Sequence, residues 1–473
     1  MSSRRLPLGD AGTRVPPSVL TSPLAVAVVC AVLGGSVASA QTPAPIEPAP
    51  AIPQAPVPPT PAPAAPPSAS TSDASRLTFT ARPGQGFTAT TGDAFALTIR
   101  PRIQLRDTLV LDDDVYDPQH SPRNEIQIKT LRLWMLGHVI NRNIRYGIQL
   151  AFGPSDFEKT SFSPIYDAFF DFTRSRDFSI KVGQYFVPFD RARTIREFAL
   201  QTVDRTAMVA EMTLDRDVGI SIYSNDFLGR GGRYGYALGL FGGEGRNRVG
   251  FYPTAGKGLT GDRFGFLYTA RFSYRPFGSF DEDAEGDLTR TRTPKLLVGV
   301  ATAYDQNSVR TRGTTGEAYY QLRPDYVWAE SDVVFKYRGF AFMGEVVMRY
   351  APQFRELYTP SSGTPTMEYS RRALGYLVQA SYYFPKRFEL WSRFDELRTP
   401  WSTDPQLVSF VNNAGRTLSG GVNYYLNGHA FKIQLQIAQT FQGPDDKRSA
   451  PYPTHYDFRR GLTYAMLQLD ATF

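Results

Sequence analysis

The chain has 473 residues and a mass of 52.7 kDa, which excludes a single small domain but fits one large all-β unit. Its 52 Lys and Arg residues outnumber its 45 Asp and Glu residues, and the net charge of +7 favours an anionic partner such as nucleic acid, lipid head groups or small anions. The only cysteine is Cys30, so disulfides within the chain are excluded.

The first 40 residues have the three parts of a secretory signal peptide. Arg4 and Arg5 supply positive charge, residues 24–33 are apolar, and Ala38-Ser39-Ala40 forms a small-residue cleavage site. We therefore expect residues 1–40 to be a signal peptide. Residues 41–75 are rich in Pro and Ala and cannot bury a core, so we expect an extended periplasmic linker there. Residues 76–473 are expected to form one domain.

Alternating apolar and polar residues begin near residue 93 and continue to the end of the chain. No run of 18 apolar residues occurs after residue 40, so no membrane-crossing helix is expected in that part. The alternation predicts about sixteen strands, at residues 94–109, 125–140, 143–153, 164–173, 177–186, 217–225, 233–242, 262–276, 294–304, 325–337, 339–350, 371–384, 387–397, 415–427, 429–441 and 460–473. Short connections alternate with long ones, and this asymmetry is typical of outer-membrane barrels.

The first of these strands separates two kinds of side chain. Phe95, Leu97 and Leu105 fall on one face, whereas Arg102 and Arg106 fall on the other. Lipid offers no hydrogen-bond partners, so strands that cross it must close into a ring with an apolar exterior. The pattern predicts an all-β, transmembrane antiparallel β-barrel of about 16 strands, which is wide enough for an aqueous channel.

The last strand ends in Phe473 after a regular alternation of apolar and polar residues. This ending is similar to the C-terminal signal that the assembly machinery of bacterial outer membranes recognises. We therefore expect Phe473 to act as an assembly signal. The expected location is the outer membrane of a Gram-negative bacterium, in contact with lipid and lipopolysaccharide.

One stretch resembles the phosphate-selective porin O and P family. The similar pieces are DAFFDF at residues 167–172, the Gly-Gln-x-x-x-Pro-Phe turn that begins at Gly183, and Asp204-Arg205 before the next strand. Residues 333–350 and 375–397 extend the similarity. The resemblance implies a trimeric channel of sixteen strands, whose third long loop folds inward and narrows the pore, with basic residues along the path of an anion.

Strand parity predicts which basic residues line the lumen. They are Arg100, Arg102, Arg106, Arg132, Arg145, Lys181, Arg271, Arg275 and Lys432, with Arg349 and Arg393 sharing the same parity. The loop at residues 187–216, which the resemblance places in the pore, adds Arg191, Arg193, Arg196 and Arg205. Rings of such charge favour anions. The expected function is passive diffusion of small hydrophilic solutes, with a preference for phosphate or other small anions.

Two alternatives remain open. Inward-facing acids would pair with the lumen arginines, and a general, non-selective porin would result; these acids are Asp167, Asp171, Glu330, Asp332, Glu345, Asp395 and Asp470. The loop at 187–216 also lacks lysine, which phosphate-specific members of the family use at the constriction. Alternatively, the barrel is plugged and serves a structural or adhesive role, with the Pro/Ala arm as its binding element.

Catalytic and metal-binding patterns are weak in this sequence. No Gly-x-Ser-x-Gly elbow or phosphate-binding Walker loop is present, so an enzyme is not expected. An enzyme would need a Ser/His pair assembled from distant strands. The four histidines are scattered, and the acidic run 281–287 has Arg292 where a calcium loop needs Glu. We expect no metal, no cofactor and no nucleic-acid partner.

Overall fold

The computed structural model describes residues 76–111, 123–157, 163–246, 265–360, 363–441 and 463–473. The predicted signal peptide and the predicted Pro/Ala linker lie outside these residues. No helix in the described part of the chain is both long enough and apolar enough to span a membrane.

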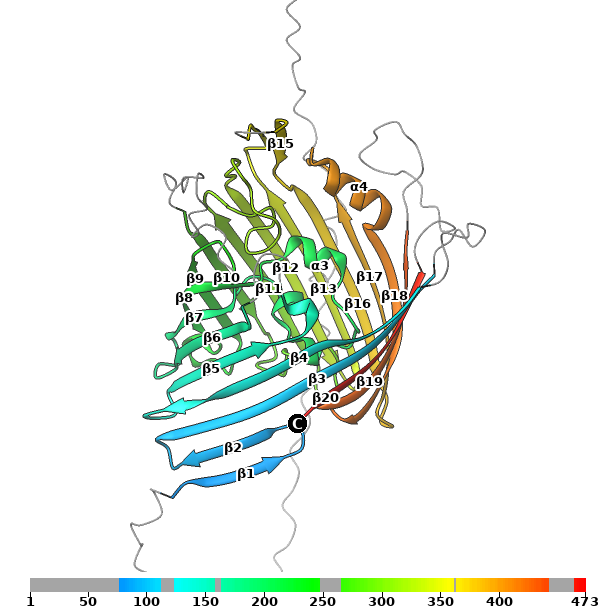
Figure 1. Cartoon of the computed structure of the whole chain (residues 1–473). Helices are drawn as coiled ribbons and strands as arrows, with labels where there is room; N and C mark the ends of the chain where they lie inside the picture. The colour runs from blue at the N-terminus through cyan, green and yellow to red at the C-terminus, as the bar shows by residue number, and fades with distance from the viewer. Residues whose placement is uncertain (1–75, 112–122, 158–162, 247–264, 361–362, 442–462) are drawn as a thin grey trace, which may run out of the picture. The chain divides into compact units, whose positions relative to one another are not determined.

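The described residues form one antiparallel sheet of eighteen strands, and all of them except β1 and β2 belong to a closed ring. Each ring strand pairs with its neighbours in chain order, and β20 pairs with β3 to close the barrel, with Thr472 opposite Arg102. The predicted barrel of about sixteen strands is therefore confirmed (Figure 1). Its strands are β3 (Phe95–Leu111), β4 (Arg123–Val139), β5 (Ile144–Ala151), β6 (Ile165–Phe172), β7 (Ser179–Phe186), β8 (Arg216–Ser224), β9 (Tyr234–Phe241), β10 (Leu267–Tyr274), β11 (Lys295–Asp305), β12 (Tyr326–Tyr337), β13 (Phe340–Tyr350), β16 (Ala373–Tyr383), β17 (Phe388–Arg398), β18 (Arg416–Asn427), β19 (Phe431–Thr440) and β20 (Thr463–Thr472).

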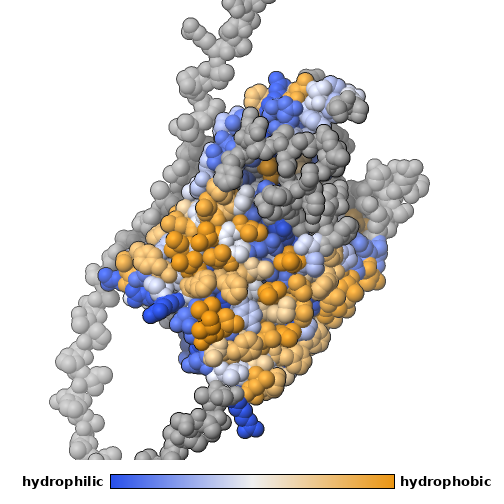
Figure 2. Space-filling model, turned by 60° about the vertical axis from the view of Figure 1, so that its left-hand side comes forward, coloured by the Kyte–Doolittle hydropathy of each residue, from blue (hydrophilic) through white to orange (hydrophobic). Residues whose placement is uncertain are grey.

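The outer side of the ring is apolar. Outward side chains such as Phe272, Val300 and Ile437 are about half exposed, whereas their inward neighbours along each strand are buried. Hydrophobic residues cover much of the wall in Figure 2, and hydrophilic residues gather toward its ends. A closed ring pairs the backbone of every strand internally, so this exterior suits lipid. The barrel belongs in the outer membrane of a Gram-negative bacterium.

The segment between β7 and β8, residues 187–215, folds into the barrel, as Figure 1 shows for its helix α3. It contains α2 (Arg191–Thr194), the 3₁₀ turn η2 (Glu197–Ala199) and α3 (Ala207–Met212). The hydroxyl of Thr206 caps α3 by accepting a hydrogen bond from the N–H of Val209. The prediction of an inward-folded third long loop is confirmed, and residues 187–215 are called the inner loop below.

The connection between β10 and β11 also turns inward, at the opposite end of the barrel. The carboxylate of Glu285 accepts a hydrogen bond from the N–H of Gln201 at 2.7 Å, and the Lys336 ammonium donates to the carbonyl oxygens of Asp281 and Ala284. Glu285 and Asp287 of this acidic segment are buried, whereas Asp281 and Asp283 are exposed. The segment supports the inner loop from the short-turn side.

Smaller elements decorate both ends of the ring. β14 (Arg355–Tyr358) and β15 (Thr366–Tyr369) form a separate hairpin at the long-loop end, and α4 (Pro405–Ala414) lies in the connection between β17 and β18. The 3₁₀ turns η1 (Pro154–Asp156) and η3 (Phe227–Gly229) lie in connections. A further hairpin, β1 (Thr78–Arg82) and β2 (Gly86–Thr91), precedes the ring and pairs with the start of β3. None of these elements is predicted by the alternation pattern.

Candidate functional site: an arginine-lined constriction

A small cavity lies between the inner loop and the wall formed by β3, β4, β5, β7 and β8, and it is called the constriction below. Its volume is about 10 Å³, enough for roughly one water molecule. Its lining contains five arginines and one carboxylate, with aromatic and amide side chains between them. The lining residues are Arg102, Arg132, Trp134, Gln149, Phe186, Arg196, Glu197, Phe198, Arg205 and Arg216.

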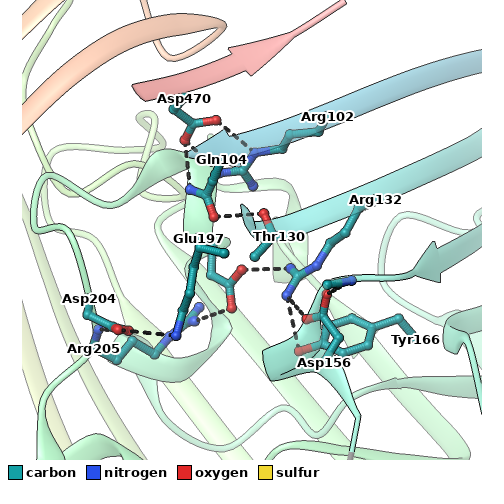
Figure 3. Close-up of polar contacts among 12 residues, drawn as sticks. Arg102, Gln104, Thr130, Arg132, Asp156, Tyr166, Glu197, Asp204, Arg205 and Asp470 are labelled. Atoms are coloured by element: carbon teal, nitrogen blue, oxygen red, sulfur yellow. Dashed lines mark hydrogen bonds and ion pairs between the residues drawn. The ribbon is translucent and has the colours of Figure 1, made fainter. Parts of the chain in front are cut away.

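Glu197 of the inner loop joins the two sides of this constriction. Its carboxylate lies 2.8 Å from a guanidinium nitrogen of Arg132 on the wall and 3.1 Å from one of Arg205 on the inner loop (Figure 3). Burial by itself would raise the pKa of Glu197, but the charges of Arg132 and Arg205 outweigh burial and hold that pKa well below its usual range. Glu197 is therefore ionised at neutral pH.

The wall arginines are anchored from behind by inward acids. Arg102 makes two hydrogen bonds to Asp470 across the β3–β20 seam, at 3.0 and 2.6 Å. Arg132 donates to Asp156 at 2.6 Å, and Arg216 donates to Asp167 at 2.8 Å. Paired, charge-assisted bonds of this kind fix the guanidinium plane. Part of the positive charge of the wall is thus offset by carboxylates.

Aromatic rings provide a second support that leaves the positive charge in place. A guanidinium over an aromatic face is attracted by the ring quadrupole, and the ring carries no countercharge. The pairs, with distances from guanidinium carbon to ring centroid, are Arg102 over Phe198 (5.1 Å), Arg132 over Tyr166 (4.3 Å), Arg196 over Trp134 (3.7 Å), and Arg216 over Tyr166 (3.8 Å) and Phe186 (3.7 Å). Four of the five constriction arginines are held in this way.

Two cations near the constriction have no carboxylate partner among the described residues. Arg196 stacks on Trp134 and makes no ion pair there, and burial lowers its pKa to about 10, so it remains charged at neutral pH. Lys181 on β7 lies over the ring of Phe169, 4.4 Å from its centroid, and likewise makes no ion pair in the described part of the chain. Nearby carboxylates such as Asp167 attract both cations without pairing with either.

A larger cavity of about 320 Å³ adjoins the constriction and shares Phe186 with it. It lies between strands β7–β10 and the start of the inner loop. Four of the cations predicted to face the lumen or the constriction line it, namely Lys181, Arg191, Arg271 and Arg275. Glu282 and Asp283 from the β10–β11 connection bring acid to the same space, and Glu282 lies 2.5 Å from Arg275. The lining of this cavity is therefore mainly basic, with acids on the side of the β10–β11 connection.

The remaining predicted residues hold the inner loop or lie at the rim. Arg106 donates to Asp204 and to the carbonyl of Val203, at 2.6 and 2.8 Å. The fully buried Lys432 donates to the carbonyl of Leu200 at 2.5 Å.

Arg193 pairs with Asp215 inside the inner loop. At the short-turn rim, Arg100 and Arg145 donate to the carbonyl oxygens of Gln85 and Arg142.

Among the lining residues that sequence-based reasoning misses, Arg216 and Trp134 are the most informative. Arg216 begins β8, where the alternation breaks down and both Arg216 and Asp217 are buried, so strand parity assigns it to the outer face. Trp134 has the inward parity of Arg132, but a single tryptophan in the sequence does not indicate that an arginine stacks on it. A search for aromatic residues two positions from inward arginines would have found it.

The comparisons with known proteins are as follows. The sequence matches no protein-family model, and no curated protein matches it. In structure the chain is similar to an anion-selective porin from Comamonas acidovorans (12% identity, TM-score 0.45, 80% of this chain and 100% of that one). It is also similar to OmpF of Salmonella typhi (11%, 0.48, 80% and 98%) and to the outer membrane channel DcaP of Acinetobacter baumannii (10%, 0.45, 80% and 98%).

Proposed function

We propose that the protein is a non-enzymatic outer-membrane porin, through which small hydrophilic solutes diffuse passively with a preference for anions. One observation carries the proposal. Five arginines and a single carboxylate line the constriction between the inner loop and the barrel wall. The carboxylates that pair with these arginines from behind, those of Asp156, Asp167, Asp215 and Asp470, do not line the cavity. An excess of fixed positive charge in a narrow, low-dielectric space attracts anions and repels cations.

The proposed solutes are oxyanions such as phosphate and small carboxylates. Guanidinium groups bind such anions with two parallel hydrogen bonds. Arg196 and Lys181, which lack carboxylate partners among the described residues, are the cations that such an anion would meet first. The resemblance to the phosphate-selective porins supports the same proposal, and with it a homotrimer, contact with lipopolysaccharide and an assembly role for Phe473.

The test is the zero-current potential of the purified full-length protein in a planar bilayer across a tenfold KCl gradient. We expect a potential of the chloride-selective sign, and we expect millimolar phosphate to reduce the chloride current. A potassium-selective or zero potential would contradict the anion preference and indicate a general porin. An unchanged current in phosphate would limit the proposal to monovalent anions.

The small size of the constriction favours a second candidate, a plugged barrel with a structural or adhesive role. A cavity of about 10 Å³ does not admit a hydrated ion unless the inner loop shifts. The same bilayer measurement separates the candidates, because folded protein that gives no conductance would support the plugged barrel. Heat-dependent migration on gels checks that the protein in the bilayer experiment is folded.

A further inference from the structure

The β1–β2 hairpin continues the barrel wall beyond the point where β20 ends. β20 pairs with β3 only as far as Arg102, while β2 pairs with residues 95–99 of the same strand. The N–H of Phe473, the last residue, donates to the carbonyl of Pro101 at 3.0 Å. The hairpin therefore lies just past the C-terminus, at the short-turn end, as Figure 1 shows. This end faces the periplasm in outer-membrane barrels.

The hairpin has one apolar and one hydroxylated face, in register with β3. Phe79 lies opposite Ala89, which lies opposite Leu97; on the same face Ala81, Phe87 and Ile99 form the next row. The opposite face carries threonines, which hydrogen-bond across the strands in the pairs Thr78–Thr90 and Thr88–Thr98. The apolar face of the hairpin is thus a continuation of the lipid-facing side of β3.

No side chain in the described part of the chain covers this apolar face. Phe79 is 75% exposed and Phe87 is 58% exposed, more than the lipid-facing Leu105 further along β3 at 42%. Two short strands with bare aromatic side chains are marginally stable in water, and contiguous apolar patches of this kind mark a contact surface. We expect something other than the described residues to cover them.

The turn of the hairpin is seated on the barrel, which fixes where the apolar face points. Gly84 has a φ of +78°, and a Cβ built on it would lie 2.3 Å from the Cβ of Ala430 in the β18–β19 turn. Only glycine allows this close approach. The hairpin is therefore held at the rim, next to the half-exposed Phe473. Aromatic residues at this level mark the membrane–water interface of barrels.

Charge at the hairpin indicates the nature of the surface that it meets. Arg76 and Arg82 flank β1, are exposed, and make no ion pair with the described residues. The nearby acid Asp93 is already paired with Arg142 at 2.6 Å. An apolar face between uncompensated arginines complements acyl chains beneath anionic phosphate head groups.

We propose that the β1–β2 hairpin is an interfacial anchor in the periplasmic leaflet, with Phe79 and Phe87 at the boundary between acyl chains and head groups. Arg76 and Arg82 then contact lipid phosphates. The hairpin widens the belt by which the barrel contacts lipid on one side of the closing seam. It also ties the start of the barrel domain to the membrane surface.

The test uses the absence of any cysteine other than Cys30. In a full-length Cys30→Ser chain, nitroxide labels are placed singly at Phe79→Cys, at Thr80→Cys on the opposite face, and at Phe272→Cys on the lipid-facing wall. The proteins are reconstituted in vesicles of phosphatidylethanolamine and phosphatidylglycerol. The ratio of collisions with oxygen to collisions with a water-soluble nickel chelate is then measured for each label.

We expect this ratio to be several-fold higher at position 79 than at position 80, and lower than at position 272. Equal ratios at 79 and 80 would overturn the proposal, because both labels would be in water. A label at 79 that is shielded from both reagents would also overturn it, since a second protein chain would then cover this face. Unchanged channel conductance of the labelled proteins shows that the barrel is folded in every case.

Discussion

The two halves of the lumen hold the inner loop in different ways. On the side of β10–β17 the contact is built around an apolar core, in which Met208, Met212 and Trp328 are fully buried, with charged contacts such as that of Arg349 with Glu211 beside it. On the side of β3–β8 the contact is a cluster of arginines, carboxylates and aromatic rings around Glu197. Apolar packing needs no water and leaves no path. Charged packing keeps donors and solvent together, so the proposed solute path lies on the arginine side.

The largest effect on stability and conductance is expected from substitutions in the apolar core that holds α3 against β10–β17. Met208 packs against the bare backbone of Gly375, where a Cβ would lie 2.4 Å from its Cγ, and the indole of Trp328 donates to the carbonyl of Met212 at 3.1 Å. Replacing both methionines by alanine removes buried side chains that contribute about 2–5 kcal/mol each. We expect a lower thermal midpoint and a larger single-channel conductance, because α3 leaves the wall.

The control for this double substitution is Val346→Ala, which removes methyl groups from the lipid-facing side, where Val346 is half exposed. Its midpoint and conductance are expected to match those of the unmodified protein. If the methionine variant conducts like the unmodified protein despite a lower midpoint, the apolar half does not restrict the channel.

The next effect is expected from removing the only carboxylate that lines the constriction cavity. Glu197→Gln leaves Arg132 and Arg205 without the charge between them. The cost in stability should stay below the roughly 3–5 kcal/mol of breaking a fully buried pair, because the Glu197 side chain is 24% exposed. We expect the permeability ratio of chloride to potassium to rise.

Glu356→Gln, on the hairpin at the long-loop end, serves as the matched control and should leave the permeability ratio unchanged. A lower ratio in the Glu197→Gln protein would mean that Glu197 attracts no cations and that its role is to hold the inner loop in place.

The fold is largely predictable because one physical constraint acts on every ring strand. Each strand has lipid on one side and the lumen on the other, so the period of two is visible in the sequence from β3 to β20. β1, with the sequence TFTAR, is too short to show such a period, and it is exposed on both faces. The hairpin is therefore missed, even though its Phe79 obeys the same rule.

The constriction is less predictable because its contacts join residues that are distant in the chain. Arg102 and Asp470 are 368 residues apart and become neighbours only when the barrel closes. Strand parity predicts that both face inward, but not that they pair. The apolar core of the lumen cannot be predicted for the same reason, because the sequence of α3 does not indicate which strands it packs against.

A smaller effect, mainly on selectivity, is expected from Arg196→Gln. This arginine makes no ion pair with the described residues, so its replacement leaves no carboxylate without its partner. We expect the chloride-to-potassium ratio to fall, and the free energy of unfolding to fall by no more than the roughly 0.5–2 kcal/mol of the stacking interaction with Trp134. Arg230→Gln, at the exposed short-turn end, is the control with the same change in charge. Equal shifts in both variants would indicate a net-charge effect.

The smallest effect is expected from replacing Trp134, whose ring stacks on Arg196. Trp134→Leu removes a stacking interaction of about 0.5–2 kcal/mol, so the guanidinium becomes less well positioned but keeps its charge. The permeability ratio should fall by less than in Arg196→Gln, and Trp134→Phe should restore most of it, because a phenyl ring keeps an aromatic face. The double variant Trp134→Leu, Arg196→Gln should match Arg196→Gln alone, since the ring then has no cation to hold. If Trp134→Leu instead lowers the ratio by the same amount in both backgrounds, Trp134 acts on the solute directly. The aromatic rings that support the arginines would then themselves contact the solute.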